Sequence, residues 1–263
     1  MTSQKIVETM VLLKSCCQTD IGLVRGNNED AFEFLPQQRF FALADGMGGH
    51  QAGEVASSEA VTFMCASIEE LFISLNENEA IHKVSSSLEE YIKNTNTWIH
   101  CLSKKRKSFQ GMGTTLSTAL FYDSQMIIGH VGDSRIYLLR DGNLTQLTKD
   151  HSIGRHTLTQ AIGTSLQITP QIEVVPVKPG DVYLMCSDGL PDLLSDEEIK
   201  KRINPLDIRS STDHLIDGAK AAGGYDNITV VLLKVEDLSR QQCDNRSRPE
   251  SSRDDATSSL ILS

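Results

Sequence analysis

The stretch that decides the fold class runs from Thr114 to Leu147 and reads TTLSTALFYDSQMIIGHVGDSRIYLLRDGNLTQL. Its apolar segments are short and rich in Leu, Ile, Tyr and Thr, which favours β-strands. Between them stand Asp123-Ser124 and Asp141-Gly142-Asn143, which are residues that tight turns prefer. This alternation predicts an antiparallel meander of strands.

Outward from this stretch, strands and helices are predicted on both sides by hydrophobic periodicity. The predicted strands cover residues 10–18, 31–35, 39–44, 172–177, 181–186 and 228–235. The predicted helices cover residues 52–75, 79–104, 192–203 and 208–222. This order predicts an α+β fold of mostly antiparallel strands, and two packed sheets with helices on both outer faces would accommodate them. We expect one folded domain over 1–236 and a polar, disordered tail over 237–263.

Composition excludes several classes of partner. The chain has 263 residues, 25 of them Lys or Arg and 35 Asp or Glu, for a net charge of −10. Such a chain repels nucleic acid and anionic membranes, and we interpret its one basic run, Lys104–Lys107, as a solvated helix end. No apolar run approaches the roughly 20 residues of a membrane span, and residues 1–8 lack the apolar core of a signal peptide. We therefore expect a cytoplasmic protein, not tethered to a membrane, with six reduced cysteines.

Acidic residues recur at the ends of the apolar strands. Asp45-Gly46, Gly132-Asp133 and Asp188-Gly189 follow predicted strands, whereas Glu29-Asp30 and Asp226-Asn227 precede them. Each pair alone is ordinary turn chemistry. Five pairs converging on one edge of a sandwich would repel one another unless cations neutralised them.

The candidate ligands all offer oxygen, which favours Mg²⁺ or Mn²⁺ over zinc. Two such ions about 3.5–4 Å apart can activate a water for in-line attack on phosphorus. Other phosphate chemistries lack their motifs: no cysteine is followed by five residues and an arginine, no D-x-D pair occurs, and there is no G-x-x-x-x-G-K-[ST] loop.

Eight segments, in this order, resemble the metal-dependent Ser/Thr protein phosphatases of type 2C (the PPM family) in their compact bacterial form. They are residues 20–31, 45–49, 111–115, 132–135, 150–152, 158–163, 186–190 and 226–229. The resemblance covers about residues 14–235 and implies a four-layer αββα sandwich, in agreement with the predicted elements. Residues 1–236 would then be the catalytic domain.

The resemblance implies hydrolysis of phosphoserine and phosphothreonine in proteins by a water that bridges two Mn²⁺ or Mg²⁺ ions. It makes Asp45 the carboxylate that bridges both ions and the Gly46 carbonyl a ligand of one. Asp188 and Asp226 match the further ligands of the first ion. Glu29 would reach the second ion directly or through a water.

Three further roles are implied by the resemblance. Arg25 matches the arginine that holds the substrate phosphate, for which a guanidinium fork is suited. Asp30 matches an acceptor for water on the metals. Asp133 and Asp192 match positions that hold a third, weaker metal in many relatives. The implied partners are phosphorylated proteins made by a cognate Ser/Thr kinase, with a monomer as the default state.

The chain departs from the family's pattern at two places. Met47 stands where many eukaryotic relatives carry a histidine proposed as general acid, which leaves water on the metals as the proton donor; His50 is not assigned that role. Residues 152–158 are very short where bacterial relatives carry a flap of roughly 20 or more residues. A short flap puts the third metal in question and predicts a more open catalytic face.

Two alternatives to a broadly acting phosphatase are a catalytically inactive scaffold and a phosphatase dedicated to one regulatory phosphoprotein. Inactive relatives usually lose metal-ligand carboxylates, and none is missing here. A dedicated phosphatase would carry a regulatory domain, for which this chain has no room. The sequence therefore favours broad phosphatase action.

Overall fold

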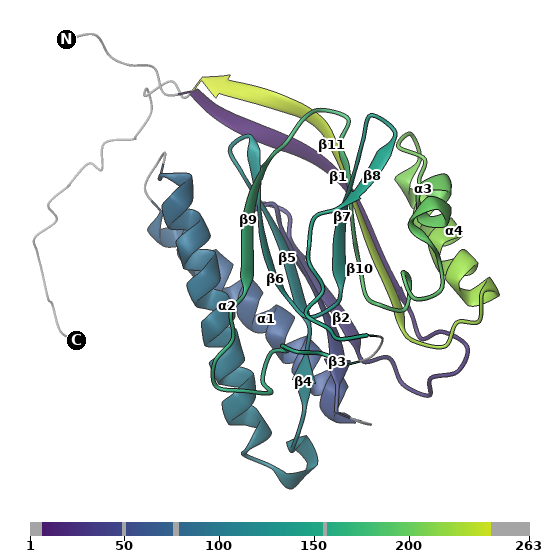
Figure 1. Ribbon diagram of the computed structural model, residues 1–263. Coiled ribbons are helices and arrows are strands. Elements are labelled where there is room, and N and C mark those ends of the chain that lie inside the picture. The colour runs from purple at the N-terminus through teal and green to yellow at the C-terminus, as the bar shows by residue number, and fades with distance from the viewer. Residues whose placement is uncertain (1–6, 49–50, 76–78, 155–156, 243–263) are drawn as a thin grey trace, which may run out of the picture.

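Two β-sheets packed face to face form the centre of the protein (Figure 1). The structure, a computed structural model, describes residues 7–48, 51–75, 79–154 and 157–242. The first sheet contains, in spatial order, β1 (Val7–Asp20), β11 (Ile228–Gln242), β10 (Val182–Cys186), β7 (Arg135–Arg140) and β8 (Asn143–Gln146). The second contains β2 (Asp30–Leu35), β3 (Phe40–Met47), β5 (Leu116–Tyr122), β6 (Gln125–Val131) and β9 (Gln171–Pro176), and β4 (Gly113–Thr114) pairs with β3. All strand pairings among the described residues are antiparallel.

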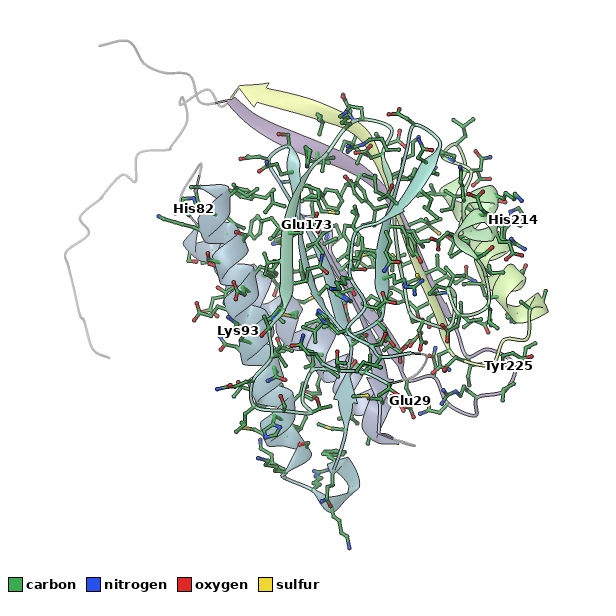
Figure 2. All side chains as sticks on the ribbon, viewed as in Figure 1. Glu29, His82, Lys93, Glu173, His214 and Tyr225 are labelled. Atoms are coloured by element: carbon green, nitrogen blue, oxygen red, sulfur yellow. The ribbon has the colours of Figure 1, made fainter. Side chains whose placement is uncertain are left out.

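Helices cover the outer face of each sheet. The second sheet is covered by α1 (Gln51–Ser74) and α2 (Ile81–Ser103), and the first by α3 (Asp196–Arg202) and α4 (Ile208–Ala221) (Figure 1). Lys93 on α2 and His214 on α4 point outward from these two outer layers (Figure 2). The layers run helix, sheet, sheet, helix, so the predicted αββα sandwich is confirmed.

The alternation of side chains along β3 builds two separate apolar layers. Phe40, Ala42 and Ala44 face the helices α1 and α2. Phe41 and Leu43 face the other sheet, because successive residues of a strand point to opposite sides. Burying a side chain of the size of Phe or Leu contributes about 1.5–3 kcal/mol, so both layers hold the strand in this register.

The layer between the sheets becomes polar at one end. At this end the inward-facing positions of three strands are polar: Asp45 on β3, Ser187 directly after β10 and Thr229 on β11. Asp30 on β2 stands opposite Asp45. An antiparallel sandwich thus collects at one edge polar residues that are far apart in the chain. This edge carries the candidate site.

The predicted single meander over residues 114–147 is wrong in one respect. β5 and β6 form a hairpin in the second sheet, whereas β7 and β8 form a hairpin in the first. The chain crosses between the sheets at Gly132, whose φ of 115° is unfavourable for residues with a side chain. A Cβ there would also lie 2.6 Å from the Thr115 side chain, so the crossing needs glycine.

Several element boundaries differ from the sequence prediction, and three of them bear on the site or the tail. β3 continues past Ala44 to Met47, because Gly46 and Met47 pair with β4. The helix expected over 192–203 begins at Asp196, where Ser195 and Glu198 form a capping box that sets its start. β11 continues to Gln242, beyond the expected tail boundary at 237, in register with β1. Residues 243–263 of that tail lie outside the described residues.

Two further observations bear on the sequence predictions. In the described part of the chain, no helix combines the length and apolar character needed to cross a membrane. Cys16, Cys17, Cys65, Cys101 and Cys186 are free thiols, and Cys243 lies outside the described residues.

Candidate active site

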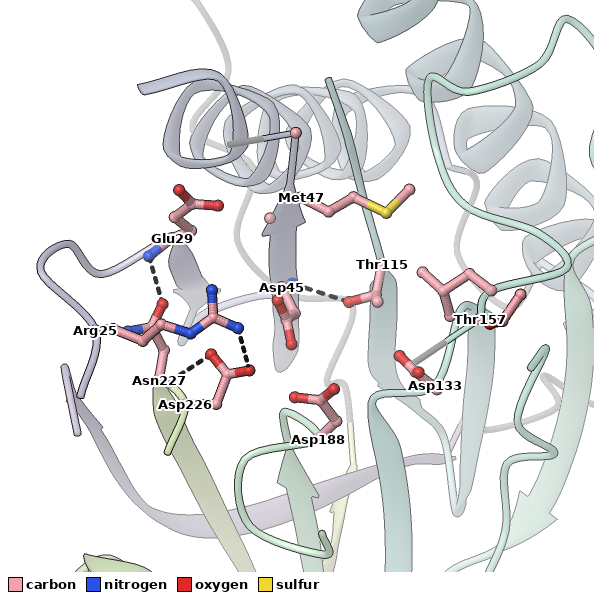
Figure 3. Close-up of a pocket in the computed structure, with 13 residues that line it drawn as sticks. Arg25, Glu29, Asp45, Met47, Thr115, Asp133, Thr157, Asp188, Asp226 and Asn227 are labelled. Atoms are coloured by element: carbon pink, nitrogen blue, oxygen red, sulfur yellow. Dashed lines mark hydrogen bonds and ion pairs between the residues drawn. The ribbon is translucent and has the colours of Figure 1, made fainter. Parts of the chain in front are cut away.

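A cavity of about 650 Å³ opens at the polar end of the inter-sheet layer (Figure 3). Its lining comes from both sheets and from the loops that precede β2 and β11. The charged residues that line it are Arg25, Glu29, Asp45, Asp133, Asp188 and Asp226. The structure thus brings together carboxylates that the sequence separates by up to about two hundred residues.

Asp45 and Gly46 are held by main-chain and hydroxyl contacts from β4 and from Thr115, which joins β4 to β5. The Asp45 N–H donates to the Thr115 hydroxyl at 2.9 Å, and the Asp45 carbonyl accepts from the Thr115 N–H at 2.8 Å and the Thr114 hydroxyl at 2.8 Å. A Cβ on Gly46 would lie 2.2 Å from the Gly53 carbonyl at the start of α1. Only glycine permits this approach, which places the Gly46 backbone against the cavity.

Asn227 ties Glu29 to the end of the first sheet. Its side-chain carbonyl accepts from the Glu29 N–H at 2.8 Å, and its amide donates to the carbonyls of Ile21 and Asn27. The Glu29 carbonyl accepts from the Gly46 N–H at 3.1 Å. The loop that carries Glu29 is therefore bonded to both sheets at once.

Asp30 does not line the cavity; it is buried directly beneath it. Its Oδ2 accepts from the Ser187 hydroxyl at 2.7 Å and from the Thr229 hydroxyl at 2.6 Å, so it links the second sheet to the first. Its other oxygen, Oδ1, is buried with no hydrogen-bond partner. Burial raises the pKa of Asp30 to about 6, against the lowering effect of these two hydroxyls.

Asp188 and Asp226 approach Asp45 from the first sheet (Figure 3). Asp188 follows β10, and its Oδ1 is also buried without a partner. Asp226 precedes β11 and accepts from a terminal nitrogen of Arg25 at 2.6 Å. The Arg25 side chain is 52% exposed at the mouth of the cavity, so the guanidinium is accessible to a ligand.

In the ranges that the structure describes, the carboxyl groups that line the cavity outnumber its one cationic lining residue, Arg25. Burial, followed by the charges of Asp30 and Asp188, raises the pKa of Asp45 well above its ordinary value. Burial, followed by the charge of Asp133, raises the pKa of Asp188 to about 7. A bound cation would favour the ionised form of these carboxyl groups and would bind their unpartnered oxygens.

The residues fit hard divalent cations. All candidate donors are oxygens, which suits Mg²⁺ or Mn²⁺. No three His, Cys, Asp or Glu side chains in the described ranges form a metal site by themselves. Such a result is compatible with these ions, since Mg²⁺ is usually held by one or two carboxylates and keeps several waters.

Asp133 and Asp192 are brought together at a smaller neighbouring cavity of about 180 Å³. Asp133 and Asp188 line both cavities, whereas Asp192 lines the smaller one and not the larger. Burial, with the charge of Asp150, raises the pKa of Asp133 to about 6. The smaller cavity thus lies beside the main one and shares Asp133 and Asp188 with it.

The described residues of the short segment 152–158 lie at the edge of the cavity. Ser152 and Leu158 are bridged as in a β-ladder, and the Ile153 N–H donates to the Thr157 carbonyl at 2.8 Å. Thr157 and Leu158 line the main cavity. Residues 155 and 156, and His50, lie outside the described residues. Met47 lines the cavity with a thioether, which has no proton to donate.

The sequence analysis gave no role to four residues that position the site. These are Thr115, Ser187, Asn227 and Thr229. All four belong to the eight segments that resemble the phosphatase family, so those segments could have indicated them. Their bonds run to residues far away in the chain, which no local pattern can show.

A family model described as "Protein phosphatase 2C" matches residues 25–229 of this chain. The chain belongs to the protein phosphatase 2C family. The matched range runs from Arg25 to Thr229, and so contains each carboxylate of the main cavity. The resemblance stated from the sequence is thereby confirmed.

Two bacterial protein phosphatases are among the relatives of this chain. The chain is 36% identical over 245 residues to the Ser/Thr protein phosphatase PstP of Mycobacterium tuberculosis, covering 86% of this chain and 46% of that protein. It is 34% identical over 242 residues to the protein phosphatase PhpP of Streptococcus pneumoniae, covering 83% of this chain and 96% of that protein. The chain thus spans about half the length of the mycobacterial relative.

Solved protein phosphatase 2C structures share the fold. The crystal structure of M. tuberculosis PstP superposes with a TM-score of 0.77 at 34% identity, over 88% of this chain and all of that one. A PstP catalytic domain in complex with two manganese ions gives a TM-score of 0.75 at 36% identity, over 87% of this chain and all of that one.

Proposed function

We propose that this chain is a metal-dependent protein phosphatase that hydrolyses phosphoserine and phosphothreonine in proteins. The observation that carries the proposal is the convergence of Asp45, Asp188 and Asp226 at one cavity, with Arg25 at its mouth. The mycobacterial structure with two manganese ions supports two Mn²⁺ or Mg²⁺ ions as the cofactors of this chain.

The metal-holding residues divide between the two sheets. Asp45 would contact both ions. Asp188 and Asp226 would complete one site, Glu29 would reach the other ion, and the Gly46 carbonyl would bind one of the two. Two ions bound there would neutralise the carboxylates, lower the pKa of a water and polarise the phosphoryl oxygens.

Arg25 binds the substrate. Its guanidinium exchanges the bond to Asp226 for two phosphate oxygens, in the paired geometry that arginine offers to phosphate. In the reaction the oxygen of a water forms a bond to phosphorus, and the bond between phosphorus and the Ser or Thr oxygen breaks. Inorganic phosphate and the free hydroxyl are the products.

Asp30 does not contact the phosphate. It orients a water and accepts a proton from it. Ser187 and Thr229 hold its Oδ2, which leaves Oδ1 as the free acceptor. Its raised pKa of about 6 is suited to taking up a proton from water near neutral pH. The thioether of Met47 excludes that residue as the acid that protonates the leaving oxygen.

The substrates we propose are phosphoproteins, made by a cognate Ser/Thr kinase in the cytoplasm, and the enzyme acts as a monomer. The names of the relatives, Ser/Thr protein phosphatases, support the phosphoprotein class. We also propose that Asp133 and Asp192 hold a third, weaker ion at the smaller cavity. The shortness of the segment 152–158 leaves the catalytic face open to many sequences.

The test is hydrolysis of a phosphothreonine peptide with Mn²⁺, with EDTA, and by the variant Asp188→Asn. Turnover that needs Mn²⁺ and falls by at least 10²-fold in the variant is expected. The exposed Asp213 on α4 gives a matched control, since Asp213→Asn should keep full activity. A folded protein without turnover under any divalent metal would instead indicate an inactive scaffold.

A further inference from the structure

A second cavity, of about 620 Å³, lies at the C-terminal end of α2. It is formed by the end of that helix, the short 3-10 helix η1 (Lys107–Phe109) and the segment before β4. In Figure 1 this region lies at the foot of the view, below β4. The cationic side chains that line it are Lys104, Arg106 and Lys107, and the His100 ring lines it as well. We call it the basic cavity.

The cations of the basic cavity lack acidic partners. Lys104, Arg106 and Lys107 are exposed, and no salt bridge involves any of them in the part of the chain that the structure describes. The Arg106 guanidinium lies 5.5 Å from the Phe109 ring centroid, which orients it without neutralising it. Three uncompensated positive charges thus gather in a chain whose net charge is −10.

A solvated helix end explains only part of this arrangement. α2 ends at Ser103 and Lys104 is its C-cap, where a cation is favoured by the helix dipole. Arg106 and Lys107 lie beyond the last turn, where that effect has faded. They nevertheless line the same concave surface as Lys104. The concavity and the shared charge indicate a site for an anionic ligand.

The basic cavity shares a wall with the catalytic cavity. Gly111 and Met112 line the former, and Gly48 lines the latter. These residues are in close contact, since a Cβ on Gly48 would lie 2.8 Å from the Met112 Cα. Because the two cavities share this wall, one extended peptide could reach both.

We propose that the basic cavity binds an acidic segment of the phosphoprotein substrate, a few residues away from the phosphorylated Ser or Thr. This inference rests on the proposed phosphatase function. An acidic segment is recognised by positive charge, and among the described residues Arg25 is the one cationic side chain that lines the catalytic cavity. The basic cavity supplies that charge beside the catalytic one.

The test uses pairs of phosphothreonine peptides whose two members differ only in carrying three Glu or three Gln residues. These residues stand three to five positions before the phosphothreonine in one pair and three to five positions after it in the other. The variant is Lys104→Glu with Arg106→Glu and Lys107→Glu. The matched control reverses three exposed cations elsewhere, Lys178→Glu with Lys201→Glu and Arg209→Glu, for the same change in net charge. p-Nitrophenyl phosphate, which has no flanking sequence, reports the catalytic centre alone.

We expect the native chain to prefer the Glu peptide over the Gln peptide by roughly tenfold in kcat/KM, on at least one side of the phosphothreonine. The basic-cavity variant should lose this preference and keep its rate on p-nitrophenyl phosphate, whereas the control should keep both. The preference should also fall at 0.5 M NaCl, where the Debye length is short. Equal rates on the two peptides, or a preference that survives in the basic-cavity variant, would overturn the inference and leave the proposed function intact.

A binding measurement separates failure of the inference from failure of the proposed function. Fluorescence anisotropy of a labelled, unphosphorylated Glu-rich peptide needs no turnover. If no phosphopeptide is hydrolysed, binding that weakens in the basic-cavity variant and not in the control still supports an acidic-peptide site. Equal binding by all three proteins overturns it. Thermal unfolding of each variant checks that the fold is retained.

Discussion

Asp30 and Asp45 stand directly opposite one another across the antiparallel pair β2 and β3. Like charges at directly opposed positions destabilise a sheet. Both side chains lie at the polar end of the inter-sheet layer, and Asp188 adds a third carboxyl from the other sheet. The cavity is therefore strained electrostatically until its carboxyls are protonated or matched by cations.

The first prediction concerns the pH dependence of the metal-free protein. Folding raises the pKa of Asp30 to about 6 and that of Asp188 to about 7, so the folded state binds more protons than the unfolded chain between about pH 4 and pH 7. The stability they contribute is present at low pH and is lost as pH rises through that window. In EDTA, the melting temperature should fall by several degrees from pH 5 to pH 7.5.

Asp188→Asn should flatten this pH profile, because the amide does not titrate, and the exposed Asp213→Asn should leave it unchanged. Saturating Mn²⁺ should raise the melting temperature of the native chain most at pH 7.5, where the carboxylates are ready to bind it. Differential scanning calorimetry at each pH measures both effects. A metal-free protein whose stability rises steadily from pH 5 to pH 7.5 would contradict this account.

The second prediction concerns Arg25. Arg25→Ala should lower kcat/KM for a phosphothreonine peptide by about 10²-fold, since a charged donor to the phosphate is lost. Arg25→Lys should give an intermediate loss, because the charge remains and the fork does not. Because its ion pair with Asp226 is half exposed, the melting temperature should change by less than about 2 °C. Native kinetics in Arg25→Ala would show that Arg25 does not bind the substrate phosphate.

The third prediction concerns the packing of Glu29 against α1. A Cβ on Gly53 would lie 2.1 Å from Glu29 Oε2 and 2.9 Å from the Gly46 carbonyl carbon. Gly53→Ala should displace the Glu29 carboxylate and raise the Mn²⁺ concentration for half-maximal activity by roughly tenfold. Gly26→Ala is the matched control, since a Cβ there meets nothing within 4 Å. Equal Mn²⁺ requirements in both variants would show that Glu29 does not help to hold metal.

The fourth prediction concerns Ser187, which joins the two sheets beneath the cavity. Its hydroxyl donates to Asp30 and accepts from the Thr229 N–H at 3.0 Å. Ser187→Ala would leave a buried donor unpaired, at a cost of about 1–3 kcal/mol. The melting temperature should fall by several degrees, as 1 kcal/mol corresponds to roughly 2–4 °C at this size. Activity should fall as well, because Asp188 is the next residue. The exposed Ser108→Ala should change neither quantity.

The core could be predicted from local sequence. The apolar run over residues 39–44 predicted a strand, and the structure places its alternate residues in two different apolar layers. The helical spacing over residues 52–75 likewise gave α1 nearly to its ends. Both patterns are short-range, with periods of 2 and 3.6 residues, so a single sequence carries them.

The distribution of hairpins between the sheets could not be predicted in this way. Residues 114–147 read as one meander because their turns are alike, yet the chain changes sheet at Gly132. That change depends on whether β7 pairs with β6 or with β10, a strand more than forty residues away. Long-range pairing decides which sheet β7 joins, and the local sequence of the turns does not predict that pairing.

The sequence by itself determined the elements, the family and the acidic residues of the site. The tertiary structure decided that Asp30 is buried beneath the cavity while Asp192 lines its neighbour, and that the basic run Lys104–Lys107 borders a cavity beside the catalytic one. The physical reason is that residue type and spacing encode local conformation, whereas burial, mutual repulsion and shared walls arise only where two sheets close over one another.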